Sequence, residues 1–93
     1  MTTNKPNRDQ IKHAVYYAVA SISGRSMADL EEGMDLGGQM PSGVGMDAIA
    51  IEAVTGMLNT WILHRNGQGQ FERGELKIDT TLGETIDAVD GKF

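Results

Sequence analysis

The chain has 93 residues, which fits a single domain with one modest core, since a domain of this size buries only about 60 to 65% of its unfolded surface. It has no cysteine, which excludes disulfides, thiolate zinc sites and a cysteine nucleophile and favours a reducing compartment, the cytoplasm. Its net charge of −5 argues against nucleic acid or a membrane surface as the main partner and favours basic protein surfaces.

The N-terminal residues 1–8 are polar and show no apolar periodicity, so we expect a flexible lead there and a single domain over residues 9–93. The lead lacks the apolar core of a signal peptide, and no apolar run approaches the roughly 20 residues that span a bilayer. Asp9 is the expected N-cap of a first helix that ends at Gly24. One face of that helix is apolar: Ile11, Ala14, Val15, Ala18, Val19 and Ile22.

A long segment from Gly24 to Met46 holds six of the twelve glycines. A single helical turn capped by Ser26 is expected near its start. Structureless loops longer than about 12 to 15 residues are uncommon in compact domains, so the segment needs buried anchors. Leu30, Leu36 and Met40 are the expected anchors.

The second helix is expected from Asp47 to about Leu63, with Asp47 as its N-cap. Two apolar stripes make it apolar over more than half of its circumference, which predicts a central position in the fold. One stripe is Ile51, Val54, Leu58, Trp61 and Ile62, and the other is Ile49, Ala53 and Leu63. Residues 64–67, "HRNG", form the expected exit from the helix.

The last part of the chain predicts a linker and one short helix. Phe71, Leu76 and Ile78 are candidates for the core in the linker. Thr81 followed by Glu84 is a capping-box pattern, and it opens a helix whose apolar face is Leu82, Ile86 and Val89.

No catalytic constellation is visible in the sequence, so we expect no enzyme activity. The two histidines, His13 and His64, lack a spaced carboxylate cluster and are interpreted as surface or capping residues, with no metal site. The glycine stretches match neither a Walker motif nor a dinucleotide-binding fingerprint. No serine lies in a nucleophile elbow.

The order of elements resembles that of acyl and peptidyl carrier proteins. The end of the chain, "TTLGETIDAV" at residues 80–89, is similar to the family's last helix, which starts Thr-Thr-Val and finishes Ile-Asp-Tyr-Ile. "MDLGG" at residues 34–38 resembles the Asp-Leu-Gly before the family's Asp-Ser-Leu attachment motif, and "IEAV" at residues 51–54 resembles Val-Glu-Leu-Val of its second helix. The resemblance implies an all-α, acyl-carrier-like four-helix bundle of three longer helices and one short one, with a long glycine-rich loop between helices 1 and 2.

The resemblance also implies a 4'-phosphopantetheine arm on a serine at the start of the second helix. Counting on from "DLGG" places Met40 at that position, and counting back from "IEAV" places Asp47 there. Only Ser42 lies between the two, so Ser42 is the candidate cofactor-binding residue. The alternative interpretation is a turn serine after Pro41.

The leading functional hypothesis is a divergent carrier-like protein that docks to partner enzymes, as a monomer, in fatty acid or polyketide biosynthesis. The candidate partner-binding residues are Met46, Asp47, Ile51 and Glu52. Asp47 has an alternative role as a helix cap. The rival hypothesis is a small helical interaction module, of the inhibitor or immunity type, without a prosthetic group.

Overall fold

The computed structural model describes residues 5–93 and contains three α-helices and one 3-10 turn in that range. The helices are α1 (Arg8–Ser23), α2 (Ala48–His64) and α3 (Leu82–Asp90), and the turn is η1 (Met27–Asp29). No strand forms within these residues, where only isolated bridges occur. None of the helices described is long and apolar enough to cross a membrane. The all-α prediction is confirmed. The four-helix bundle is not, because the only further helical element in the described range is the three-residue turn η1.

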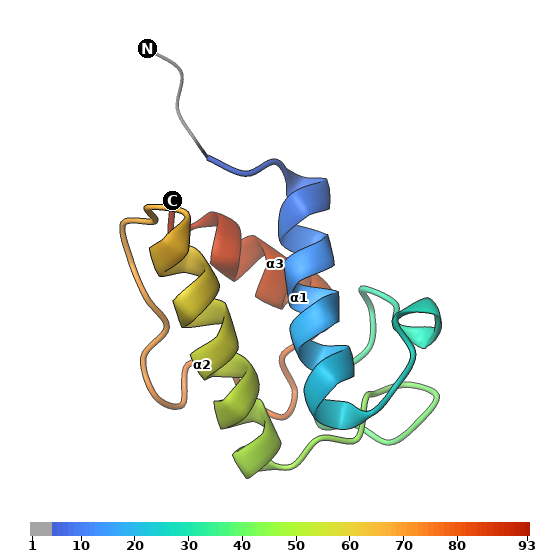
Figure 1. Cartoon of the computed structure of the whole chain (residues 1–93). Coiled ribbons are helices and arrows are strands. Elements are labelled where there is room, and N and C mark those ends of the chain that lie inside the picture. Colours follow the sequence, from blue (N-terminus) through green and yellow to red (C-terminus); the bar gives the residue numbers. More distant parts are fainter. Residues whose placement is uncertain (1–4) are drawn as a thin grey trace.

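Helix α1 is the centre of the domain, because it packs against both α2 and α3 and also contacts η1. Figure 1 shows α1 and α2 side by side and running in opposite directions, with α3 passing behind α1. Five buried side chains of α1 supply its contact face: Ile11, Val15, Tyr16, Ala18 and Val19. The prediction that the second helix is central is therefore wrong. Helices α2 and α3 both pack against the apolar face of α1, whereas one side of α2 is exposed to solvent.

The start of α1 differs from the prediction, and its end agrees with it. Asn7, not Asp9, is the N-cap: its side chain accepts from the backbone N–H of Gln10, and the Gln10 side chain accepts from that of Asn7. This reciprocal pair satisfies two backbone donors at once, which Asp9 inside the first turn cannot do. Residues 1–4 of the expected lead lie outside the described part of the chain. Gly24 ends the helix in the left-handed conformation, as expected.

The glycine-rich segment is held by backbone hydrogen bonds on two sides. Residues 34–37 pair with residues 42–46, where the N–H of Val44 donates to Asp35 at 2.8 Å and that of Met46 to Leu36 at 3.0 Å. On the other side, the N–H of Leu36 donates to Thr80 at 2.9 Å. The side chains of Leu30 and Leu36 are buried, as expected, but Met40 is 41% exposed. Met34, Val44 and Met46 are the additional anchors.

Two glycines in this segment are required by close backbone approach. A Cβ at Gly43 would fall on the backbone of Gly38, and one at Gly37 would fall on the side chain of Ile78. Neither neighbour can move away easily, because the surrounding backbone is paired on both sides. The glycines therefore permit tight packing of this segment.

Helix α2 begins at the predicted cap and buries only one of its two apolar stripes. The Asp47 side chain accepts from the N–H of Ala50 at 2.8 Å. Ile51, Val54, Leu58 and Ile62 are buried. Ile49 and Leu63 are 77% and 63% exposed, and Ala53 is exposed as well. The second stripe is thus a solvent face, because no other element of the described chain covers that side of α2. At the exit, Asn66 takes a positive φ of 60°.

The connection from α2 to α3 forms turns and no helix, in agreement with the linker expected there. The Asn59 side chain fastens it to α2, accepting from the N–H of Phe71 at 2.7 Å and donating to its carbonyl oxygen at 3.1 Å. Phe71 and Leu76 are buried, as expected. Ile78 is 55% exposed, contrary to the prediction, because it packs over the bare backbone of Gly37 rather than into the core.

Helix α3 has the predicted capping box, in which Thr81 and Glu84 exchange side-chain and backbone hydrogen bonds. Its apolar face, Leu82, Ile86 and Val89, is fully buried. Gly83 lets the backbone of Glu32 approach, and its N–H donates to that carbonyl oxygen at 2.8 Å.

Arg8 connects the start of α1 to two other parts of the fold. Its guanidinium pairs with the carboxylates of Asp87 at 2.6 Å and Glu32 at 2.7 Å. The hydrogen bond to Asp87, and to a smaller extent the one to Glu32, raises the pKa of Arg8 above its ordinary value. All three groups are substantially exposed, so we expect the ion pairs to orient α1 more than to stabilise it.

The paired glycine segment gives a direct test of the fold. We expect Gly43→Ala to lower the free energy of unfolding by about 2 kcal/mol or more, because the new methyl group overlaps the backbone of Gly38. Gly33→Ala is the matched control, since nothing lies within 4 Å of the place its methyl group would take, and its change should stay within roughly 0.5 kcal/mol. Urea denaturation measures both values, and equal losses would contradict this view of the segment.

Candidate functional site

Ser42, the candidate attachment residue, lies in an exposed turn at residues 40–42. Its hydroxyl donates to the carbonyl oxygen of Gln39 at 3.0 Å, and its own carbonyl oxygen accepts from the N–H of Asp35 at 3.1 Å. The buried residues Val44 and Met46 separate it along the chain from the start of α2. The hydroxyl therefore lies on a turn that is held by hydrogen bonds. This turn is not at the start of the second helix, where the resemblance places the attachment serine.

Asp47 occupies the position at the start of α2. Its backbone is extended, and its carboxylate accepts from the third N–H of the helix. An N-cap carboxylate both satisfies a free backbone donor and meets the positive end of the helix dipole. Helix capping therefore accounts for Asp47 without any bound ligand.

The four candidate partner-binding residues divide into two buried and two exposed. The side chains of Met46 and Ile51 are only 5% and 3% exposed. Both therefore belong to the core and not, as predicted, to a partner-binding surface. Both point inward because Met46 anchors the glycine-rich segment and Ile51 belongs to the buried stripe of α2. Asp47 and Glu52 remain on the surface, where Glu52 pairs with Arg73 at 2.7 Å.

The solvent face of α2 carries large apolar side chains at both of its ends. We call this surface the outer face of α2, defined by Ile49, Ala53, Gly56, Thr60 and Leu63. All five residues are exposed, and only small side chains lie between Ile49 and Leu63. The sequence contained the signal for this face, a second helical stripe, but periodicity cannot tell a buried stripe from an exposed one.

A groove of about 930 Å³ lies between the first half of α1 and the second half of α2. It exists because α1 presents the small side chains Ala14 and Ala18 there, while α2 presents Gly56 at one end. Trp61 fills part of the space and meets Phe93 edge to face, with ring centroids 5.9 Å apart. The fold thus leaves an apolar hollow beside its main helix pair.

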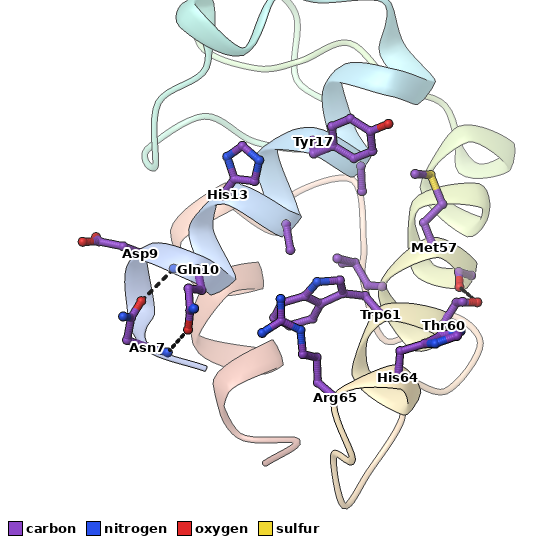
Figure 2. A pocket seen from close by; sticks show the side chains of 14 residues that line it. Asn7, Asp9, Gln10, His13, Tyr17, Met57, Thr60, Trp61, His64 and Arg65 are labelled. Atoms are coloured by element: carbon purple, nitrogen blue, oxygen red, sulfur yellow. Dashed lines mark hydrogen bonds between the residues drawn. The ribbon is translucent and has the colours of Figure 1, made fainter. Parts of the chain in front are cut away.

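The groove is bordered by aromatic, sulfur-containing and basic side chains. In Figure 2, His13 and Tyr17 extend from α1, Met57 and Trp61 extend from α2, and Arg65 extends from the C-cap of α2. The Arg65 guanidinium lies over the Trp61 ring, 5.1 Å from its centroid. Sequence reasoning missed this groove, since no local pattern places the start of α1 against the end of α2.

No protein-family model matches this chain, and neither a curated protein nor a solved structure matches it.

The role of Asp47 as a cap can be measured. We expect Asp47→Ala to lower the free energy of unfolding by about 1 kcal/mol, because a backbone donor loses its acceptor. Asp47→Ser should retain most of the stability, since a serine hydroxyl is also a good N-cap acceptor. Chemical denaturation measures the free energy of unfolding of both variants. An Asp47→Ala protein as stable as the wild type would contradict the capping role.

Proposed function

We propose that this chain is a carrier-like binding module that docks to a partner protein and performs no catalysis of its own. The observation that carries this proposal is the outer face of α2, where Ile49 and Leu63 are 77% and 63% exposed. Exposed apolar patches with polar surroundings commonly mark interaction sites. We place this interaction in the cytoplasm, with the module itself a monomer.

The chemistry of the face favours a partner with an apolar patch bordered by basic residues. Ala53, Gly56 and Thr60 keep the middle of the face low, so that a partner surface can approach the helix backbone, while Ile49 and Leu63 enter pockets at either end. Asp47 and Glu52 add acidic groups near the first end, and the chain as a whole carries a charge of −5. Complementary charge would mainly raise the rate of association.

Two versions of the module differ in the phosphopantetheine arm. The resemblance in helix order supports an arm on Ser42, whose hydroxyl is exposed. The capping geometry of Asp47 supports an interaction module without an arm, because a carboxylate that cannot accept the group stands at the helix start. We favour the version without an arm.

The docking surface can be tested by affinity capture from the native host. We expect Ile49→Asp and Leu63→Asp to reduce a specifically bound protein about tenfold or more, as for central interface residues. Met40→Asp is the matched control, since Met40 is a large exposed side chain on the glycine-rich segment. The captured protein is then purified and its affinity measured directly by calorimetry. Loss of binding with Met40→Asp alone would move the site to the glycine-rich segment and contradict the proposal.

The arm is tested separately by intact mass after incubation with coenzyme A and a broad-specificity phosphopantetheinyl transferase. We expect an unchanged mass for the wild-type chain. A mass increase of one arm that Ser42→Ala abolishes would establish Ser42 as the attachment site and the protein as an active carrier. The variant Asp47→Ser places a hydroxyl at the helix start and shows whether the transferase recognises the surrounding surface.

A further inference from the structure

The groove between α1 and α2 has the size and lining of a small-molecule site, and of the residues that define the proposed docking face only Gly56 and Thr60 also line it. Its volume of about 930 Å³ lies within the range of ligand pockets, roughly 300 to 1,000 Å³. Ala14 and Ala18 of α1 line one side, and Met57 and Trp61 of α2 line the other. Displacement of water from a concave apolar surface of this kind by an apolar ligand is thermodynamically favourable.

Arg65 supplies the polar end of this groove. Its guanidinium lies over the Trp61 ring, and within residues 5–93 no carboxylate lies within ion-pair distance of it. This situation contrasts with most of the other basic side chains, which do form ion pairs: Lys5, Arg8, Lys12, Arg73 and Lys92. In a chain with 13 acidic and 8 basic residues, an arginine without an ion pair on an apolar wall is a candidate anion receptor.

The chemistry of a guanidinium selects the kind of anion. Its planar fork matches a carboxylate and can form two parallel hydrogen bonds, and stacking on an aromatic ring holds the fork in place. Arg65 is the only lysine or arginine among the described residues that line the groove, so a second negative group on the ligand would find no such partner. A ligand with a single carboxylate at one end and an apolar body fits both conditions.

We propose that the groove between α1 and α2 binds a small apolar monocarboxylate. The carboxylate pairs with Arg65, and the apolar body lies along Ala14, Tyr17 and Met57. Met57 and Trp61 are on the side of α2 that faces α1, whereas Ile49 and Leu63 are on the solvent side. Occupation of the groove therefore leaves Ile49 and Leu63 free, although Gly56 and Thr60 belong to both surfaces. The Arg65 and Ala14 variants test the groove and the Ile49 and Leu63 variants test the docking face, so either proposal can fail without the other.

Trp61 is the only tryptophan of the chain and reports on the groove directly. The experiment titrates the protein with decanoate at neutral pH, below the concentration at which decanoate forms micelles, and follows tryptophan fluorescence. Decanol and decyltrimethylammonium are matched probes with a neutral and a cationic head. We expect saturable binding of decanoate, weaker binding of decanol, and the weakest binding of the cation.

Three variants assign the binding to the groove. Arg65→Gln should weaken the binding of decanoate about tenfold, which is the loss expected for one charge-assisted hydrogen-bonded pair. The affinity for decanol should not change, because decanol carries no charge. Arg25→Gln is the control, because Arg25 also lacks a carboxylate partner in the described chain but does not line the groove. Ala14→Leu should weaken binding of both probes, since its larger side chain takes up part of the space along α1 where the apolar body lies.

The comparison uses dissociation constants rather than intensities, because Arg65→Gln also changes the surroundings of the Trp61 ring. Arg65 is exposed, so the fold should survive its substitution, and circular dichroism checks this for each variant. The proposal is overturned if decanoate gives no saturable change, if it binds wild type and Arg65→Gln equally, or if Ala14→Leu binds as well as wild type.

Discussion

The fold depends on the two-sided backbone pairing of residues 34–37. Leu36 is fully buried, its N–H donates to Thr80 just before α3, and its carbonyl oxygen accepts from Met46 just before α2. One short segment thereby fixes where two helices start. Buried backbone groups need partners, and here they find them in chain segments that lie far apart in sequence. The bare backbones of Gly37 and Gly43 make this approach sterically possible.

Helix α1 organises the rest by packing against two helices at once. Its larger apolar side chains serve the core, while Ala14 and Ala18 line its side toward the second half of α2 and leave the groove open. Within the described residues, helix α2 packs on α1 and is hydrogen-bonded through Asn59 to Phe71 of the following connection, while its outer face stays in solvent. Both proposed surfaces therefore follow from the same packing arrangement.

The two surfaces of α2 differ in their chemistry. The outer face is low and apolar with acidic neighbours at its first end, which suits a protein partner. The groove is concave, and Arg65 at one end lacks an ion pair in the part of the chain described by the structure. Ser42 lies on neither surface, since its turn belongs to the segment before α2. A helix of 17 residues, about 25 Å long, thus presents two surfaces of different chemistry that share only Gly56 and Thr60.

The sequence by itself determined the positions of the helices, because caps and helical periodicity are interactions between residues three or four positions apart. Gly24, Asp47 and the pair Thr81 and Glu84 marked helix ends correctly, whereas Asp9 did not mark the start of α1. The core faces of α1 and α3 followed from spacing, apart from Ile22, which is exposed, and Tyr16, which is buried outside the predicted stripe.

Only the tertiary structure decided which apolar residues are buried and where the surfaces lie. Ile49 and Leu63 have the helical spacing of a core stripe but meet no neighbour in the described chain, whereas Met34 and Val44 are buried in the glycine-rich segment. The burial of Met46 rather than Met40, and the position of Ala14 and Trp61 in one groove, depend on segments that are distant in sequence. Burial is set by the partner surface that covers a side chain, and local pattern carries no information about that partner.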